Sequence, residues 1–304
     1  MRYATAGALR AAIDQRLVQQ STESGVDIAR LRRRVVFERL LVRFAAGQAW
    51  EQTSGRSTEG IPGKGGVWVL KGGAALEFRL ADRARATKDV DVEMRHGELG
   101  HEEIRGLFVE TLLVDPDGDF FTFRLDSFGP ITVGNAPGPI LRSKLDCRLD
   151  GRTFDRITVD MTMDEAAHHR IEPLRLPGLL GFADLSPATI LAVDLDRHFA
   201  EKLHAMVRDY GGRPSSRVKD LADLVLLIDM GLEPTAELHA AATEVFAARD
   251  GTSAPSDIPD PPSTWAARFG ELADELNLSA PAIGAAMDAL RSFWSRALTT
   301  PKEN

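Results

Sequence analysis

The sequence VWVLKGGAALEFRLADRARATKDVDVEM spans residues 67–94 and contains two predicted strands, which are joined by a glycine pair and a short helix. The apolar run 67–70 is typical of a buried strand, and residues 74–80, after Gly72 and Gly73, are compatible with a helix. Residues 88–94, KDVDVEM, alternate between charged and apolar side chains. Because side chains point to opposite faces of a strand with period two, this alternation predicts one acidic and one apolar face.

The acidic face of that second strand carries Asp89, Asp91 and Glu93. Carboxylates in a row repel one another unless water or a cation neutralises them, and Mg²⁺ prefers such oxygen ligands. A solvated edge strand is the other interpretation, since carboxylates are mostly exposed. The glycine pair favours the metal here, because glycines let a phosphate approach the backbone at a helix N-terminus. The pattern therefore predicts a site for a triphosphate and its metal ion.

A second alternating pair of segments, 141–150 and 153–162, is joined by the hairpin signal Asp150-Gly151. In the returning segment Asp160 lies on the face opposite the apolar residues. Two-metal phosphoryl transfer needs a third carboxylate on a neighbouring strand. We predict that Asp160 joins the two earlier aspartates as a metal ligand and assists the deprotonation of an attacking hydroxyl.

Two predicted helices of the C-terminal half carry charged residues on their apolar sides. Ser186-Pro187 predicts the start of one helix, which runs to about residue 209 and has Lys202 on its apolar stripe. Such a lysine either extends outward to solvent or meets an anion. The next helix is predicted from Val218, with Asp220 on its inner side. A buried acid needs a partner, and the candidates are Arg217, Lys219 and Lys202.

The N-terminal residues 6–50 predict helices, most clearly over 26–50. This stretch carries a group of arginines, Arg30, Arg32, Arg33, Arg34, Arg39 and Arg43. They indicate either a solvated helix face with Glu38 as a partner or a basic face that contacts RNA phosphates.

The composition is that of an ordinary globular protein, with 304 residues of which 43% are hydrophobic and 27% charged. We find no apolar run long enough for a transmembrane helix and no signal-peptide core near the N-terminus. The single cysteine, Cys147, excludes an intramolecular disulfide. These features predict a cytoplasmic protein with no membrane partner. The net charge of −8 argues against a protein that coats nucleic acid but allows a local basic groove.

Several of these motifs together resemble a known family. Leu70-Lys71-Gly72-Gly73, followed by Arg85, Thr87 and Asp89-Val90-Asp91, is similar to the nucleotidyltransferases of the polymerase-β-like superfamily. More narrowly it resembles the AbiEii/MenT family, the toxin components of AbiE-type (type IV) toxin–antitoxin pairs. Residues 201–206, EKLHAM, and 219–224, KDLADL, extend the resemblance, which covers roughly residues 30–230. The superfamily often has Gly-Ser in place of Gly72-Gly73, so one potential phosphate-binding hydroxyl is missing here.

The resemblance implies an α/β fold, a polymerase-β-like nucleotidyltransferase mixed sheet with a helical N-terminal extension and a largely helical C-terminal domain. We expect an N-terminal helical segment at 1–60, a nucleotidyltransferase core at 61–175 and a C-terminal helical domain at 176–304. The implied site residues fall into overlapping groups: metal ligands Asp89, Asp91 and Asp160; nucleotide contacts Lys71, Gly72, Gly73, Arg85 and Lys202; and catalytic residues Asp89, Asp91, Asp160, Lys202 and Asp220.

The resemblance also implies a reaction. Mg²⁺, or Mn²⁺ in its place, would assist the transfer of NMP from a nucleoside triphosphate to the 3′ end of tRNA, which stops aminoacylation and translation. A cognate antitoxin protein is the implied partner. Two alternatives stay open: a nucleotidyltransferase that modifies a protein or small molecule, and a non-catalytic protein that binds a nucleotide or a partner.

Overall fold

The computed structural model describes residues 1–53, 67–95, 99–131, 140–163, 170–209 and 215–301. For residues 47–53 it describes the backbone only. Backbone contacts divide the chain into two compact units. The helical unit contains Val193–Asn304 and the short segment Leu80–Arg85, and the sheet unit contains the described remainder of residues 1–192. The three-part division expected from the sequence, at 1–60, 61–175 and 176–304, stays a proposal.

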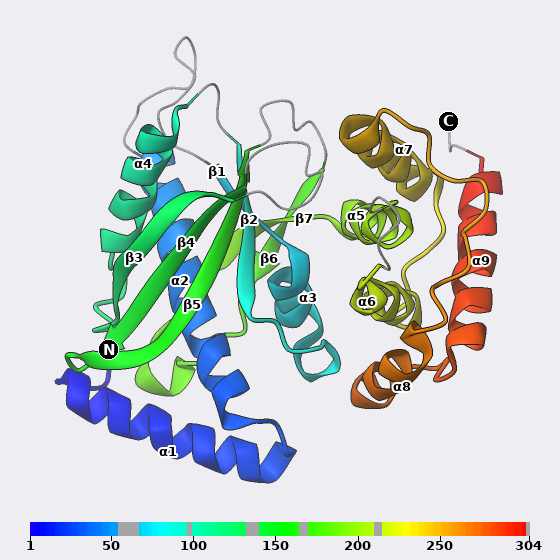
Figure 1. The fold of residues 1–304 in the computed structure, drawn as a ribbon. Coiled ribbons are helices and arrows are strands. Elements are labelled where there is room, and N and C mark those ends of the chain that lie inside the picture. The colour runs from blue at the N-terminus through cyan, green and yellow to red at the C-terminus, as the bar shows by residue number, and fades with distance from the viewer. Residues whose placement is uncertain (54–66, 96–98, 132–139, 164–169, 210–214, 302–304) are drawn as a thin grey trace. The chain divides into compact units, whose positions relative to one another are not determined.

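The sheet unit is built on seven strands in the order β3-β4-β5-β2-β1-β7-β6 (Figure 1). Their bounds are β1 Val67–Lys71, β2 Asp89–Arg95, β3 Thr122–Ile131, β4 Ile140–Leu149, β5 Arg152–Met163, β6 Ile171–Arg175 and β7 Thr189–Val193. β2 is parallel to β5 and β1 is parallel to β7, whereas β1 and β2, β3 and β4, and β4 and β5 are antiparallel. The mixed sheet confirms the predicted fold class.

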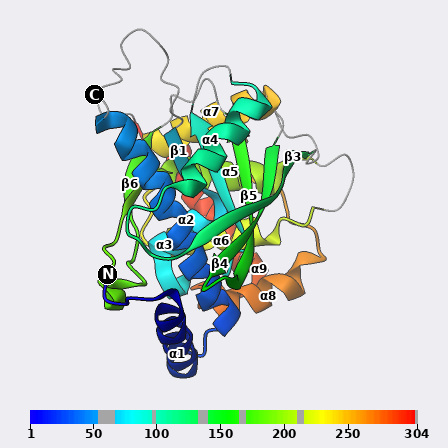
Figure 2. The same ribbon diagram turned by 90° about the vertical axis from the view of Figure 1, so that its left-hand side faces the viewer.

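Helices cover the apolar face of this sheet. The bounds in the sheet unit are α1 Ala6–Ser24, α2 Ile28–Thr53, α3 Gly72–Leu80 and α4 His101–Leu113. α2 and α4 lie across one face of the sheet (Figure 2). The core joins Val90 and Val92 of β2 to Leu40 and Phe44 of α2, all fully buried. Because side chains alternate along β2, Asp89 and Asp91 are carried on the other face.

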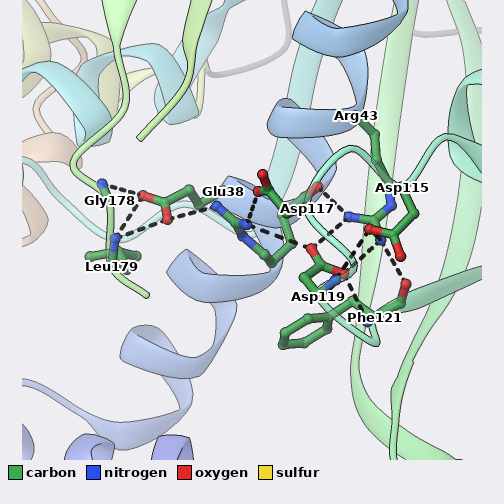
Figure 3. A network of polar contacts seen from close by, with 9 residues as sticks. Glu38, Arg43, Asp115, Asp117, Asp119, Phe121, Gly178 and Leu179 are labelled. Atoms are coloured by element: carbon green, nitrogen blue, oxygen red, sulfur yellow. Dashed lines mark hydrogen bonds and ion pairs between the residues drawn. The ribbon is translucent and has the colours of Figure 1, made fainter. Parts of the chain in front are cut away.

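Three arginines of α2, Arg34, Arg39 and Arg43, are buried inside the sheet unit, whereas Arg30, Arg32 and Arg33 are partly exposed. Arg39 and Arg43 are 0% and 1% exposed. The Arg43 guanidinium donates to both oxygens of Asp119, at 3.0 and 2.9 Å, and to the carbonyl oxygen of Phe121 at 2.6 Å (Figure 3). Arg39 donates to Asp117 at 2.9 Å. A charge inside a protein must be paired, and these arginines are therefore committed to internal carboxylates rather than to solvent or RNA.

Glu38 belongs to the same buried network, which Figure 3 shows. It lies 3.3 Å from the Arg39 guanidinium and accepts hydrogen bonds from the backbone N–H groups of Gly178 and Leu179, at 2.8 and 2.9 Å. The expected pairing of Glu38 with an arginine of α2 is present, but it is buried. α2 thereby anchors two loops of the sheet unit through charged side chains.

The helix predicted from Ser186 begins later than expected. Residues 189–193 form β7, and α5 begins at Leu195, with the Asp194 carboxylate accepting a hydrogen bond from the Arg197 backbone N–H at 2.8 Å. Leu191, which falls within the predicted helix, pairs with Val69 of β1 instead. The fully buried Ile190 and Ala192 favour a strand because they fill the sheet beside β1, and this tertiary burial outweighs the Ser-Pro signal.

The helical unit consists of α5 Leu195–Val207, α6 Val218–Asp229, α7 Ala236–Asp250, α8 Trp265–Leu276 and α9 Ile283–Thr299. Its apolar residues, among them Phe199, Leu224, Phe269 and Trp294, are almost completely buried. In the described part of the chain, no helix combines the length and the apolar character needed to cross a membrane.

Candidate active site

The acids predicted from the sequence meet on the polar face of the sheet. β2 and β5 run parallel in a register that places Asp91 directly opposite Asp160. Asp89 is two residues earlier on the same face and lies opposite Thr158. All three aspartates are partly buried. The parallel pairing thus brings together three carboxylates that are up to 71 positions apart in the sequence, 89 to 160.

The pair of opposed acids belongs to a row of charged residues that crosses four strands. On the β1 side Lys71 is the partner of Asp91, and on the β4 side Arg142 is the partner of Asp160. We call Arg142, Asp160, Asp91 and Lys71 the charge row. Like charges directly opposite one another destabilise a sheet, whereas opposite charges stabilise it. The two outer cations of the row therefore compensate the repulsion between its two inner acids.

Arg142 binds Asp160 through both of its carboxylate oxygens. Nε donates to Oδ1 at 2.7 Å and Nη2 donates to Oδ2 at 2.6 Å. The hydrogen bond with Asp160 raises the pKa of Arg142 against the opposing effect of burial, and the charges of Asp160, Asp89 and Asp91 raise it further. The guanidinium is thus held in the field of all three acids.

Lys71, at the other end of the charge row, reaches beyond its neighbouring strand. Its Nζ donates to Oγ1 of Thr162 on β5 at 2.6 Å. Since β2 lies between β1 and β5, the lysine side chain crosses the strand that carries Asp91. A cation in this position is suitable for contacting a phosphate that is bound near the acids.

Gly72 and Gly73 open α3 directly after β1. Gly72 has a φ of +62°, and a Cβ built on it would lie 2.1 Å from Oδ2 of Asp91. Only glycine tolerates both this backbone conformation and this close approach. The glycine pair therefore places the first N–H groups of a helix beside the Asp91 carboxylate, which is the arrangement that the sequence predicted for a phosphate site.

A second polar cluster lies in the helical unit. The Lys202 ammonium donates to Asp223 at 2.6 Å and to Asp220 at 3.1 Å, and Arg85 donates to both oxygens of Asp223 at 2.9 Å. We call Arg85, Lys202, Asp220 and Asp223 the lysine cluster. Arg217 lies 3.6 Å from Asp220. Lys202 therefore binds carboxylates instead of extending outward to solvent. Of the three partners predicted for Asp220, two are confirmed, Lys202 and Arg217.

The charged groups of the lysine cluster shift one another's pKa toward the ionised form. Burial by itself lowers the pKa of Lys202, but the carboxylates of Asp223 and Asp220 outweigh that effect and raise the pKa above its ordinary value. Burial by itself raises the pKa of Asp223, and the charges of Lys202 and Arg85 reverse this and hold the pKa below its usual range. Lys202 and Asp223 therefore both carry their charges near neutral pH.

Arg142 and Asp223 were not predicted from the sequence as parts of these clusters. Asp223 follows Asp220 by three residues, a spacing that places both on one side of a helix, so the helical period was a usable signal. Arg142 was assigned to the polar side of its strand, but its partner depends on the register of β4 against β5.

The three aspartates on the polar face of the sheet fit a metal ion in part. Asp89 and Asp91 offer the carboxylate oxygens that Mg²⁺ prefers, and Mg²⁺ is usually held by one or two carboxylates together with water and substrate phosphates. Both oxygens of Asp160 accept from Arg142 instead. Within the described ranges, no group of three or more histidine, cysteine, aspartate or glutamate side chains is arranged to hold a metal ion. The donor set thus fits one ion at Asp89 and Asp91.

The family model described as "Nucleotidyl transferase AbiEii toxin, Type IV TA system" matches residues 60–295. The chain belongs to the AbiEii nucleotidyltransferase toxin family. This AbiEii protein is therefore a nucleotidyltransferase and a toxin of the type IV toxin–antitoxin class, as the sequence motifs predicted. No curated protein sequence matches the chain significantly.

Solved structures agree with the fold of this AbiEii protein. The nucleotidyltransferase toxin MenT4 from Mycobacterium tuberculosis superposes with a TM-score of 0.54 at 15% identity, over 95% of this chain and 90% of that chain. At this identity the likeness supports the fold alone. An antigenic nucleotidyltransferase-like protein from Paracoccidioides brasiliensis, with 17% identity over 70% of this chain and 89% of that chain, has a TM-score of 0.36, too low to support the assignment.

Proposed function

We propose that this toxin transfers NMP from a nucleoside triphosphate to the 3′ end of tRNA in a Mg²⁺-dependent reaction, and that the modified tRNA can no longer be aminoacylated. The observation that supports the chemistry is the register of β2 against β5, which groups Asp89, Asp91 and Asp160 on one polar face beside Gly72. Opposed carboxylates are costly for folding, and a role in holding a metal–triphosphate complex accounts for them.

In the proposed reaction Asp89 and Asp91 hold Mg²⁺, which when bound neutralises the triphosphate and makes its α-phosphorus more electrophilic. The N–H groups of Gly72 and Gly73 position the phosphate tail. Lys71 contributes a positive charge beside Asp91. The acceptor hydroxyl oxygen forms a bond to the α-phosphorus and gives its proton to water, while the bond to the β-phosphate oxygen breaks and pyrophosphate leaves with the bonding electrons.

The lysine cluster is proposed to bind the phosphates of a nucleoside triphosphate. Lys202 and Arg85 carry permanent positive charge near neutral pH, and triphosphate oxygens are suitable ligands for both. Asp220 and Asp223 orient the two cations and keep them charged.

Family membership supports a cognate antitoxin as the protein partner, since the family is described as the toxin of a type IV toxin–antitoxin system. A tRNA substrate would place the protein in the cytoplasm.

A protein or a small molecule is the second candidate acceptor. The net charge of −8 favours it, because nucleic acid repels an acidic protein that lacks a strong local basic surface. The buried ion pairs of Arg39 and Arg43 strengthen this alternative, since they remove two cations from the predicted RNA-contacting group.

Label transfer tests the proposal. The full-length protein is incubated with Mg²⁺, total tRNA and each α-labelled nucleoside triphosphate in turn, beside Asp91→Ala and the control Glu102→Ala, which removes an exposed acid of α4. We expect label on the tRNA 3′ end with the wild type and the control but not with Asp91→Ala. Label on protein or on a small molecule, with none on tRNA, would show that the acceptor is the second candidate. Equal labelling by Asp91→Ala would contradict the metal site.

A further inference from the structure

The sequence predicts Asp160 as the third metal ligand. In the structure, however, both of its carboxylate oxygens accept hydrogen bonds from an arginine side chain. Nε and Nη2 of Arg142 donate to Oδ1 and Oδ2 of Asp160 at 2.7 and 2.6 Å. A guanidinium matches a carboxylate in this two-bond geometry and stays protonated at every pH that a protein survives. Asp160 is therefore already neutralised before any metal ion arrives.

The ion pair follows from the strand register. Arg142 and Asp160 are cross-strand partners on β4 and β5, and the next strand, β2, places Asp91 on the other side of Asp160. Asp160 thus has a fixed cation on one side and a second carboxylate on the other. The two residues that flank Arg142 on β4, Leu141 and Ser143, are fully buried, which fixes the backbone from which the arginine extends.

A divalent ion bound to Asp160 would meet one of two obstacles. If Arg142 stayed in place, the ion would lie beside a like charge. If Arg142 were displaced, both of its hydrogen bonds to Asp160 would be lost, together with the attraction of Asp89 and Asp91. An ion held by Asp89 and Asp91 would leave both hydrogen bonds of the Arg142–Asp160 pair in place.

We propose that Arg142 takes the place of a second metal ion, so that this toxin binds one divalent cation at Asp89 and Asp91 while Asp160 is held by the Arg142 guanidinium. The inference rests on the proposed function, in which Asp89 and Asp91 bind the metal. Arg142 is then a positioning residue: it fixes both carboxylate oxygens of Asp160 and stabilises the opposed carboxylates of the charge row.

Binding of Mn²⁺ alone to the full-length protein tests this proposal, with the free ion measured by electron paramagnetic resonance. We expect the wild type to bind one Mn²⁺ per chain and Asp160→Asn to bind the same number. Arg142→Met should gain a second Mn²⁺, and the double variant with Asp160→Asn should lose it again. Lys144→Met is the matched control, since Lys144 lies on the same strand face but opposite Thr158. It should bind one ion.

Thermal unfolding gives a second readout that does not depend on activity. Because ligands stabilise the folded state by mass action, Mn²⁺ should raise the melting temperature of Arg142→Met more than that of the wild type or Lys144→Met. Arg142→Lys, which keeps the charge but cannot bind both oxygens in the same plane, should stay close to the wild type in the number of ions bound.

Two outcomes would overturn the inference: a second Mn²⁺ in the wild type that Asp160→Asn removes, or no gain of a site in Arg142→Met. If Arg142→Met does not fold, the comparison of the wild type with Asp160→Asn still decides. Full Mn²⁺ binding by Asp91→Asn would instead overturn the proposed function, so the two failures are distinguishable.

Discussion

Asp91 and Asp160 are direct cross-strand partners on the parallel strands β2 and β5. Two carboxylates in this position repel one another, and the rest of the charge row, Lys71 and Arg142, compensates the repulsion from the outside. The direct contact of two like charges does not by itself stabilise the sheet. We attribute the pairing to a site that binds a cation.

Removing one of the opposed acids should change the stability little and inactivate the protein. We expect Asp91→Asn to change the free energy of unfolding without metal by less than about 1 kcal/mol, because the relief of the repulsion from Asp160 is offset by the lost attraction of Lys71. Transfer should fall by about 100-fold or more, because the metal stabilises the transition state by several kcal/mol. Urea unfolding and label transfer measure the two effects.

Asp89→Asn is the control for that prediction, because Asp89 lies opposite Thr158 instead of an acid. It should lose activity as well, and it should be less stable than Asp91→Asn because it relieves no repulsion between opposed carboxylates. Equal stability of the two variants would show that the Asp91–Asp160 pairing has no special energetic effect.

Gly72 should be irreplaceable for two separate reasons. Alanine there would suffer from the positive φ, which costs about 1–2 kcal/mol, and its Cβ would push against Oδ2 of Asp91, 2.1 Å away. Gly118→Ala is the matched control, since Gly118 has the same φ of +62° but no atom within 4 Å of the position that a Cβ would take. We expect Gly72→Ala to lose more stability than Gly118→Ala, and to lose transfer activity as well. Equal losses in urea unfolding would argue against the contact.

The lysine cluster should respond unequally to loss of its two acids. Asp223 is 1% exposed and neutralises both Lys202 and Arg85, so Asp223→Asn should cost about 3–5 kcal/mol of stability. Asp220→Asn should cost less, because its contact with Lys202 is longer, 3.1 against 2.6 Å, and Asp223 remains. A larger loss for Asp220→Asn in urea unfolding would contradict this ranking.

The same cluster predicts a pH dependence. The pKa of Asp223 is lower in the folded state than its ordinary value of about 3.9, so its stabilising effect is complete above that value and is lost as the pH falls through the folded pKa. The pKa of Lys202 is raised, so its effect is complete below about pH 10.4 and is lost as the pH rises through the folded pKa. The stability difference between the wild type and Asp223→Asn should therefore be constant near neutral pH and shrink at both extremes.

Arg43 should matter for folding rather than for RNA binding. Arg43→Met would leave the buried Asp119 without its main cation and should cost about 3–5 kcal/mol in urea unfolding. Arg33, 26% exposed and 3.6 Å from Asp155, is the control, and Arg33→Met should cost about 0–1 kcal/mol. A folded Arg43→Met protein with weakened affinity for tRNA would instead support the interpretation of α2 as a basic face that contacts RNA phosphates.

Much of the sheet followed from the sequence because strand alternation is local. The faces of β2, β4 and β5 were assigned correctly, but the partner of Asp160 was not. A two-residue turn at Asp150-Gly151 pairs Leu149 with Arg152 and, continued without a shift, would place Asp160 opposite Leu141. That pairing would put the polar side chains of β5 on the same face as the apolar side chains of β4. The alternation of the two strands therefore implies a shift of one residue in their register. The structure places the shift between Cys147 and Arg148, and Asp160 then faces Arg142.

Local patterns in the chain were enough to identify the glycine turn, the acidic strand face and the family, because period-two alternation and glycine conformation depend on neighbouring residues alone. Only the tertiary structure decided which acids oppose one another, that Arg142 holds Asp160, and that Asp223 holds Lys202 and Arg85. Strand order, register and burial follow from packing apolar faces that are distant in the sequence. The partner of a buried charge is therefore a property of the whole fold.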